Sequence, residues 1–451
     1  MENLDQLRAL GLFDSRVPRY TSYPTAPVFS PAVGADFQAE CLERLDPAKP
    51  VSVYVHIPFC ERLCWFCACR TQGTKTLSPV ESYLDTIEAE LAHIAVHLPR
   101  GVRMGRLHWG GGTPTILPPA MIHRLSQSLK AVIPPAEEFE FSVEIDPTMV
   151  DDAKIAALKD EDMSRASLGI QDFWDKVQKA IGREQSFEAT ERCVRALRDA
   201  GVVSLNTDLV YGLPYQTVDT VRASVEKVLS LAPDRVALFG YAHVPHMSKR
   251  QNLIDEATLP GDVERYHLFC AASAMFQEAG FDAIGIDHFA RPDDGLATAM
   301  RKGRLRRNFQ GYTEDTCGTL IGLGASSISR FDGGYVQNAA ATGAYTQRID
   351  AGTLAGYRGY CLTEQDKLHA RAIEMLMCDF RIDSRTLRAE FGDVCGALAP
   401  IHGTVAAKFQ GMAEQMGEDL RIREEGRPLT RIIAAEYDQF RSIGATFSRA
   451  S

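Results

Sequence analysis

From residue 51 onward, short apolar and β-branched runs alternate with longer segments of helical periodicity, and this alternation restricts the fold more than any other feature. We predict strands at 51–57, 106–109, 139–145, 166–170, 205–210 and 236–241. Helical segments lie between them, for example at 82–97, 187–200 and 217–231. Nearly continuous apolar strands that alternate with helices are typical of parallel sheets built from βα units. The sequence therefore predicts an α/β fold with a partial, parallel (βα)6 barrel.

The segments on either side of the predicted barrel have a different character. Residues 17–27, V-P-R-Y-T-S-Y-P-T-A-P, contain three prolines and no helical period, so we expect irregular backbone there and a short helix only near 34–45. Residues 285–313 are rich in Gly, Asp, Arg and aromatics, which indicates a functional surface or covering loops. Helical patterns return at 363–378, 384–391, 404–416 and 427–440. We therefore divide the chain into an N-terminal arm (1–50), the barrel with its covering segments (51–355) and a smaller, mainly helical C-terminal domain of winged-helix character (356–451).

The charge balance limits the partners. The chain has 49 Lys and Arg against 59 Asp and Glu, a formal net charge of −10, which argues against a general nucleic-acid or membrane-surface binder. A local basic pocket for an acidic small molecule stays possible. No run of 18 apolar residues occurs, so no membrane insertion is expected. The first residues lack the features of a secretion signal, and we expect a cytoplasmic protein.

Four of the 11 cysteines lie within ten residues: Cys60, Cys64, Cys67 and Cys69. The other seven are dispersed and fit the role of small buried apolar residues. Three kinds of site could explain these four clustered cysteines. Structural zinc normally brings two separate knuckles together, and a redox dithiol would need only one C-x-x-C pair. The C-x3-C-x2-C spacing on one loop favours an iron–sulfur cluster with three protein ligands, which leaves one iron open to bind a substrate directly.

Other motifs follow the predicted strands. W-G-G-G-T-P-T (109–115) ends the second strand, where glycines allow close backbone approach to a ligand, or simply form a turn. Glu144, Gln171, Arg183 and Asp208 follow or lie within later strands, at the rim where barrel active sites assemble. A carboxylate such as Asp208 inside an apolar strand is costly unless it is paired or hydrogen-bonded. We interpret this ordered set as ligand contacts, with structural hydrogen bonds as the alternative.

Two further segments have plainer interpretations. The run G-L-G-A-S-S-I (322–328) lacks the third glycine of a dinucleotide loop, so we expect a tight packed turn. The run R-K-G-R-L-R-R (301–307) is either a solvated turn or a guide for an anionic substrate. No G-x-S-x-G elbow for serine hydrolase chemistry is present.

The cysteine spacing after the first strand, with the glycine motif one strand later, resembles the radical S-adenosylmethionine (SAM) superfamily. Within it, the chain resembles the oxygen-independent coproporphyrinogen III oxidases over almost its full length. The motifs that carry this resemblance are at 18–25, 54–60, 108–115, 208–214, 241–245, 287–294 and 307–313. The arm and the last two motifs distinguish this family from shorter haem-chaperone-like relatives.

The resemblance implies a step of haem biosynthesis without oxygen. Two propionate side chains of coproporphyrinogen III would become vinyl groups, giving protoporphyrinogen IX and two CO2. A 5′-deoxyadenosyl radical, made from SAM at a [4Fe–4S] cluster, would remove a hydrogen from the propionate β-carbon. An unidentified electron donor and acceptor would take part, and we expect a monomer that inserts in no membrane and binds no nucleic acid.

The resemblance also implies residue roles. Cys60, Cys64 and Cys67 would bind the cluster, with Cys69 a non-ligating neighbour. Two SAM molecules would contact Tyr54, Phe66, Gly111, Gly112, Thr113, Glu144, Gln171, Arg183, Asp208, Ala242 and Ile328. Of these, Tyr54, Gly111, Glu144 and Ile328 resemble the contacts of the iron-bound SAM, and the others resemble the second site. As contacts for the substrate propionates we suggest Arg19, Arg291 and Arg307.

The chain departs from the family pattern at three positions: Trp65, Ala68 and Gly240 stand where we expect Tyr, Gly and Asn. None of these changes removes a metal ligand. Two rival functions remain: a haem-binding trafficking protein on the same scaffold, and a radical SAM methyltransferase or ring-opening enzyme that acts on haem.

Overall fold

A single twelve-stranded sheet forms the framework of the computed structural model, which describes residues 2–441, 447 and 450. Its strand order is β16-β15-β14-β13-β1-β4-β5-β6-β7-β8-β10-β9. The six central strands are parallel neighbours, β1 (Val51–Ile57), β4 (Met104–Gly111), β5 (Pro135–Ile145), β6 (Met163–Gln171), β7 (Ser204–Tyr211) and β8 (Arg235–Gly240). The predicted partial parallel barrel is therefore confirmed, and each predicted strand lies within four residues of its observed bounds.

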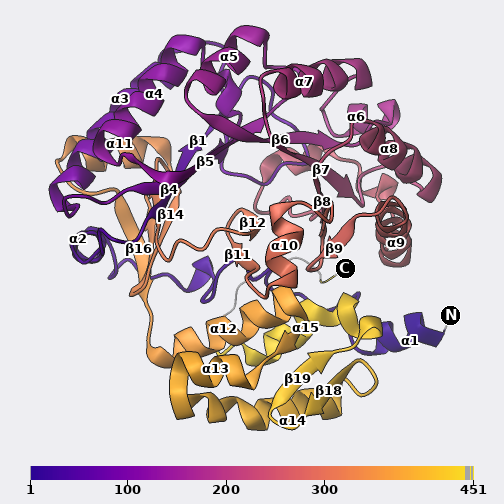
Figure 1. The fold of residues 1–451 in the computed structure, drawn as a ribbon. Helices are drawn as coiled ribbons and strands as arrows, with labels where there is room; N and C mark the ends of the chain where they lie inside the picture. The colour runs from indigo at the N-terminus through magenta and orange to yellow at the C-terminus, as the bar shows by residue number, and fades with distance from the viewer. Residues whose placement is uncertain (1, 442–446, 448–449, 451) are drawn as a thin grey trace.

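Helices connect these strands and lie on the outer, convex side of the sheet (Figure 1). They are α3 (Ser78–His97), α4 (Pro119–Val132), α5 (Asp152–Asp160), α6 (Asp175–Ala180), α7 (Phe187–Asp199), α8 (Val218–Ser230) and α9 (Asp262–Glu278). Local sequence sets where they begin. The Ser186 side chain caps α7 by accepting from the Ala189 N–H, and Thr217 with Thr220 forms a capping box at α8.

The sheet continues beyond the six parallel strands at both edges. On one side β13 (Leu320–Leu323) adds in parallel to β1, and β14 (Ile328–Phe331), β15 (Gly334–Asn338) and β16 (Gly356–Cys361) follow antiparallel. The helix α11 (Thr342–Asp350) connects β15 to β16. On the other side β10 (His288–Ala290) pairs antiparallel with β8, and β9 (Asp282–Ile284) pairs antiparallel with β10 at the edge of the sheet.

Residues 285–313 are more ordered than the covering loops we expected. Besides β10 they form α10 (Gly295–Arg301) and the hairpin of β11 (Arg306–Asn308) and β12 (Gly311–Thr313). Leu296, Leu305 and Tyr312 are buried together in a small core of their own. The apolar side chains of this segment are too sparse in the sequence to show a helical or strand period. The segment is ordered because side chains from other segments complete its small core.

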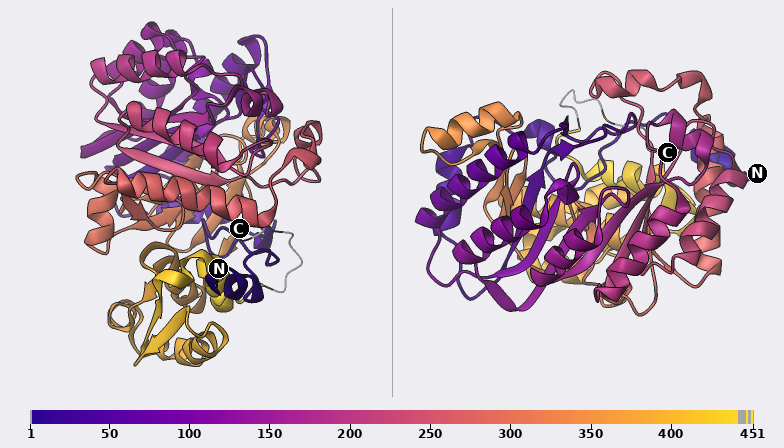
Figure 2. Two further views of the ribbon diagram at one scale, coloured as in Figure 1. Left: turned by 90° about the vertical axis from the view of Figure 1, so that its right-hand side faces the viewer. Right: turned by 90° about the horizontal axis from the view of Figure 1, so that it is seen from above.

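The C-terminal residues form a lobe beside the open side of the barrel, as Figure 2 shows. It contains α12 (Glu364–Asp379), α13 (Ser384–Phe391), α14 (Ala399–Lys408) and α15 (Thr430–Ala434) around a three-stranded antiparallel sheet of β17 (Arg381–Ile382), β19 (Asp419–Ile422) and β18 (Ala413–Met416). The helix expected at 404–416 is wrong in its second half, because α14 ends at Lys408 and residues 413–416 form β18, which pairs with β19. Between the two, Gly411 has φ +83°, a left-handed conformation that turns the chain away from the helix. The helix expected at 427–440 is a single short α-helix flanked by 3-10 turns.

The N-terminal arm packs against this lobe. It contains α2 (Ala35–Glu43), close to the predicted short helix, and an unexpected first helix, α1 (Glu2–Ala9). Leu7 and Leu12 are buried in the same apolar core as α12 and α15, and tertiary packing of this kind stabilises a helix too short to form alone. Farther along, the Tyr20 hydroxyl donates to Asp438 Oδ2 at 2.9 Å, and the Gln439 N–H donates to the Tyr23 hydroxyl. The proposed domain boundaries at 50 and 355 remain predictions. No helix in the described part of the chain is long and apolar enough to cross a membrane.

Candidate active site

The cysteine cluster lies on a loop that closes on itself at the carboxyl end of β1. The short strands β2 (Phe59–Cys60) and β3 (Gln72–Gly73) pair in parallel and join the two ends of the loop. The Trp65 N–H donates to the Ile181 carbonyl at 2.8 Å, and Gln251 Nε2 donates to the Phe66 carbonyl at 2.7 Å. The loop is therefore held from several sides of the barrel rim, which fixes the positions of its thiols.

Positive charge surrounds these thiols. Arg183 Nη1 lies 3.5 Å from Cys64 Sγ and 3.2 Å from the carboxylate of Asp146. A hydrogen bond from the Cys69 thiol lowers the pKa of Cys67 to about 6, although burial opposes this and the charge of Arg250 contributes further. Thiolate, not thiol, is the form that binds metal. The surroundings therefore suit a metal-binding loop.

The number and type of the thiols on this loop fit a cluster. Among the residues that the structure describes, no three His, Cys, Asp or Glu side chains converge on one point as ligands of a single ion would. The ligands of a [4Fe–4S] cluster each bind a different iron, so their sulfurs stand farther apart than those around one ion. Cys60, Cys64 and Cys67 are three thiols on one fixed loop, which is the ligand type and number that a [4Fe–4S] cluster with one open iron takes.

The glycine run at the end of β4 lets the cysteine loop lie directly on the strand. Gly111 has φ +111°, and a Cβ there would lie 2.6 Å from the ring of His56. A Cβ on Gly112 would lie 2.5 Å from the Phe59 carbonyl oxygen. The Gly112 and Thr113 N–H groups donate to the Ile57 and Phe59 carbonyls, both at 2.8 Å. The close contact between the end of β4 and the start of the cysteine loop thus requires glycine at 111 and 112, with or without a ligand beside them.

Glu144, Tyr54 and His108 form one contact group inside the barrel. Glu144 accepts hydrogen bonds from the Gly111 N–H at 3.0 Å and from His108 Nε2 at 3.3 Å. Although burial opposes ionisation, the His108 and Gly111 hydrogen bonds hold the pKa of Glu144 below its ordinary value. The Tyr54 ring stacks on His108 with centroids 5.7 Å apart. The group presents an ionised carboxylate next to the glycine run.

Asp208 faces the same interior as Glu144. Both side chains line a cavity of about 220 Å³ within the barrel, together with Gln310 of the β11–β12 hairpin. Asp208 accepts from Asn206 Nδ2 at 2.8 Å and from the Ser167 hydroxyl at 3.3 Å. Burial, and then the charge of Glu144, raises the pKa of Asp208 to about 6. The strand carboxylate is therefore hydrogen-bonded, and it also lines a cavity.

Gln171 and Arg183 stand side by side near the end of β6. Gln171 has φ +70°, a left-handed conformation that costs a residue with a side chain on the order of 1 kcal/mol and that concentrates at functional sites. Arg183 Nη2 donates to the Gly169 carbonyl at 2.8 Å. The predicted set of strand-end residues thus gathers at one rim, next to the cysteine loop.

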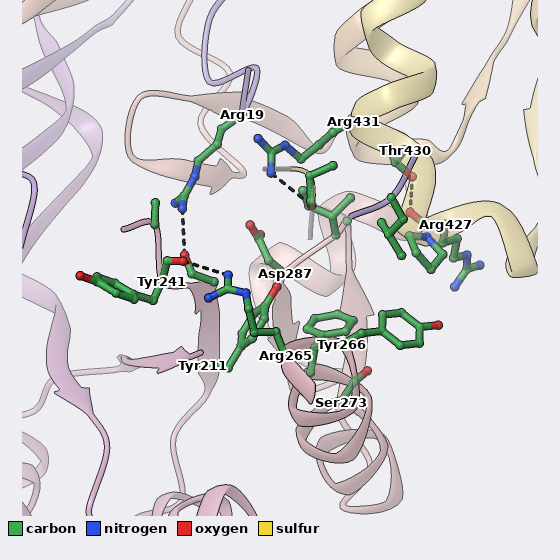
Figure 3. Close-up of a pocket in the computed structure, with 18 of the residues that line it drawn as sticks. Arg19, Tyr211, Tyr241, Arg265, Tyr266, Ser273, Asp287, Arg427, Thr430 and Arg431 are labelled. Carbon is green, nitrogen blue, oxygen red and sulfur yellow. Dashed lines mark hydrogen bonds between the residues drawn. The ribbon is translucent and has the colours of Figure 1, made fainter. Parts of the chain in front are cut away.

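A larger cavity, of about 600 Å³, lies where the end of β8, the N-terminal arm and the C-terminal lobe meet (Figure 3). Ala242, Arg19 and Arg307 of the predicted set line it, whereas Arg291 does not. The Arg291 guanidinium lies over the Phe281 ring, 5.9 Å from its centroid. Arg431 lines the cavity and was missed by the sequence reasoning. The sequence feature that could have indicated Arg431 is that it is a single arginine beside the apolar residues of α15.

Comparisons with known proteins agree with this geometry. A family model described as the radical SAM superfamily matches residues 54–228. The oxygen-independent coproporphyrinogen III oxidase of Cereibacter sphaeroides strain ATCC 17025 is 62% identical over 100% of both chains. The enzyme of that name from Escherichia coli K12 is 37% identical over 94% of this chain and 93% of its own. A solved structure of the Escherichia coli coproporphyrinogen III oxidase, described as a radical SAM enzyme, has a TM-score of 0.90 at 35% identity and covers 94% of this chain and 100% of its own.

Proposed function

Since the chain belongs to the radical SAM family of oxygen-independent coproporphyrinogen III oxidases, we propose that Cys60, Cys64 and Cys67 hold its [4Fe–4S] cluster. The enzyme converts two propionate side chains of coproporphyrinogen III into vinyl groups and yields protoporphyrinogen IX for haem biosynthesis. The bound cluster and SAM supply the 5′-deoxyadenosyl radical that removes hydrogen from the substrate. The observation that carries the residue assignment is the fixed cysteine loop with Arg183 against Cys64 Sγ.

The chain's own residues position and shield the reactants. Arg183 places a buried positive charge beside a ligand thiolate, and Asp146 holds that guanidinium in place. Glu144 fixes the end of β4 through the Gly111 N–H and keeps an ionised carboxylate at the rim. Enclosure of the reactants by the barrel, the arm and the C-terminal lobe would limit the access of water, which would otherwise intercept a radical.

The SAM contacts follow the residues that the family resemblance implies. We propose that Tyr54, Gly111, Glu144 and Ile328 contact the iron-bound SAM. A second SAM site would use the other positions, Phe66, Gly112, Thr113, Gln171, Arg183, Asp208 and Ala242. Glu144, of the first set, and Asp208, of the second, line the same cavity, so the two proposed sites would be neighbours.

The partners and compartment are proposals of the same kind. An external electron donor and acceptor complete each vinyl group, and the chain acts as a monomer. All eleven cysteines are unpaired, which suits the reducing cytoplasm.

A Cys64→Ser variant tests the assignment. The reconstituted protein is given SAM, dithionite and coproporphyrinogen III without oxygen, and protoporphyrinogen and 5′-deoxyadenosine are measured. We expect the variant to lose the brown absorbance of the cluster and all SAM cleavage. The control is Cys193→Ser, a buried cysteine of α7 remote in sequence from the loop, which should keep both. A Cys64 variant that retains iron and activity would show the ligand assignment to be wrong, and haem retention without decarboxylation would favour the trafficking function.

A further inference from the structure

The cavity at the meeting point of barrel, arm and C-terminal lobe is strongly cationic for so acidic a chain. Six arginines and four carboxylates line it, whereas the whole chain has a net charge of −10. Figure 3 shows Arg19 from the arm and Arg431 from α15 pointing into the same space, with the Asp287 carboxylate between them. Arg307, on β11, also lines the cavity. Three segments far apart in the sequence therefore place arginines around one space.

Two of these arginines donate hydrogen bonds to main-chain oxygens. Arg19 Nη2 donates to the Gly240 carbonyl at 2.9 Å, and Arg431 donates to the carbonyls of Val17 and Pro18. A carbonyl is a weaker partner for a guanidinium than a carboxylate, because charge-assisted hydrogen bonds are about twice as strong. Arg19, which donates to the Gly240 carbonyl, thus retains the capacity to bind an anion.

Arg307 shows this capacity most directly. Its side chain is 4% exposed, and within the described part of the chain its buried Nε and Nη1 atoms have no hydrogen-bond partner. Its nearest carboxylate, Asp287, is 3.9 Å from Nη1, beyond hydrogen-bond distance. The guanidinium lies over the Tyr312 ring, 4.4 Å from its centroid, but this contact supplies no oxygen acceptor to Nε and Nη1. A buried donor without an acceptor is costly, and a ligand oxygen would remove that cost.

The local electrostatics favour an added negative charge. Burial, and then repulsion from Arg19 and Arg307, lowers the pKa of Arg431 to about 9. Although burial opposes ionisation, His288 and Arg307 hold the pKa of Asp287 at about 2. Asp287 is therefore already ionised, and it leaves a net positive charge among the three arginines.

The remaining walls of the cavity suit a large ring. Tyr211, Tyr266, Phe269 and Phe289 line it, and its volume of about 600 Å³ lies in the range of small-molecule sites. Ala242, which we assign to SAM, lines the same space. A ligand held here would therefore extend from the arginines toward the cofactor side.

We propose that Arg19, Arg307 and Arg431 form the binding site for carboxylates of the tetrapyrrole propionates, with the aromatic wall against the ring. This inference rests on the proposed function, because it takes the tetracarboxylate substrate of that reaction as the ligand. Guanidinium groups match carboxylates in shape and charge, and three of them serve several propionates of one molecule.

Binding of coproporphyrin III, the stable oxidised analogue with the same four carboxylates, tests the site in the reconstituted holoenzyme. Its affinity is measured by absorbance titration for the wild type, Arg19→Gln and Arg307→Gln. Arg304→Gln is the matched control, because Arg304 lies in the same basic run and is exposed. The same titrations with the uncharged tetramethyl ester, and with SAM, separate loss of charge recognition from loss of structure.

We expect each variant at Arg19 or Arg307 to bind coproporphyrin III at least tenfold more weakly, with Arg304→Gln unchanged. Binding of the ester and of SAM should not change. Arg431→Lys keeps the positive charge and should therefore lose less affinity for coproporphyrin III than Arg431→Gln does. Three results would each overturn the inference. The variants could lose as much affinity for the ester as for coproporphyrin III, they could lose affinity for SAM and not for coproporphyrin III, or their affinity for coproporphyrin III could be unchanged. Turnover of coproporphyrinogen III by the same wild-type preparation separates the two claims: no product refutes the proposed function, whereas turnover with unaffected variants refutes only this site.

Discussion

Glu90 on α3 is a buried carboxylate whose replacement by glutamine tests how the barrel holds the turn that leads to Ile328. Its side chain is 0% exposed. It accepts hydrogen bonds from the Gly324 N–H at 2.8 Å, Asn338 Nδ2 at 2.7 Å and the Tyr345 hydroxyl at 2.7 Å. Burial outweighs these three donors and raises the pKa of Glu90 from 4.5 to about 7. The native protein therefore binds a proton at Glu90 more tightly than the unfolded chain does.

This shift fixes the sign of the pH dependence. Between pH 4.5 and 7 the native state holds more protons at Glu90 than the unfolded state, so stability falls as pH rises. Between pH 5 and pH 8 the two pKa values give a loss of about 2.5 kcal/mol. Glutamine does not titrate, so Glu90→Gln removes this contribution to the dependence of the free energy of unfolding on pH. At roughly 1 °C per kcal/mol, from an unfolding entropy of about 2.1 cal/mol/K per residue over 451 residues, the Tm difference between variant and wild type should shift by about 2.5 °C in favour of the variant.

Calorimetry of the holoenzyme under nitrogen at pH 5 and pH 8 measures this change. Glu88→Gln is the matched control on the same helix: its hydrogen bond with Arg124 lowers the pKa of Glu88. The stabilisation from Glu88 is therefore lost only as pH falls through that lowered pKa, and its variant should add no slope between pH 5 and 8. A Tm difference for Glu90→Gln that is the same at both pH values, within 1 °C, would refute the reasoning about the buried carboxylate.

Two further predictions concern the glycine run and a buried ion pair. Gly112→Ala places a Cβ 2.5 Å from a backbone oxygen of the cysteine loop and should lower bound iron and SAM cleavage at least tenfold, whereas Gly343→Ala, which meets open space, should change neither. Arg235→Gln removes the partner of Asp294, whose two oxygens lie 2.7 and 2.8 Å from Arg235 Nε. It should destabilise the protein by about 3–5 kcal/mol in a denaturant titration, while Arg388→Gln, from an exposed pair, should leave the midpoint unchanged. Retained iron in the first case, or equal midpoints for the two arginine variants, would contradict the stated contacts.

The six parallel strands and the cysteine loop could be predicted because their signals are local. Apolar runs such as 51–57 form a strand wherever two faces are buried, and the spacing of Cys60, Cys64 and Cys67 is a property of one loop. The first helix and the β18 strand could not be predicted, because their short segments gain stability only from the C-terminal core. Arg291 and Arg431 show the same limit for the site. Arg291 stands in the 287–294 motif and Arg431 in an apolar run, and only the fold brings Arg431 to the cavity and leaves Arg291 outside it.

The sequence by itself determined the chemistry of this protein, since ligand type and spacing within one short segment specify an iron–sulfur loop, and the motifs around it specify a family. The tertiary structure decided where the arginines of the proposed carboxylate site come together. The arm, β11 and α15 are separated by hundreds of residues, and their arginines become one site only when the lobe packs on the barrel. A net charge of −10 gives no hint of that site, because electrostatic attraction depends on the charges close to a ligand and not on their sum over the chain.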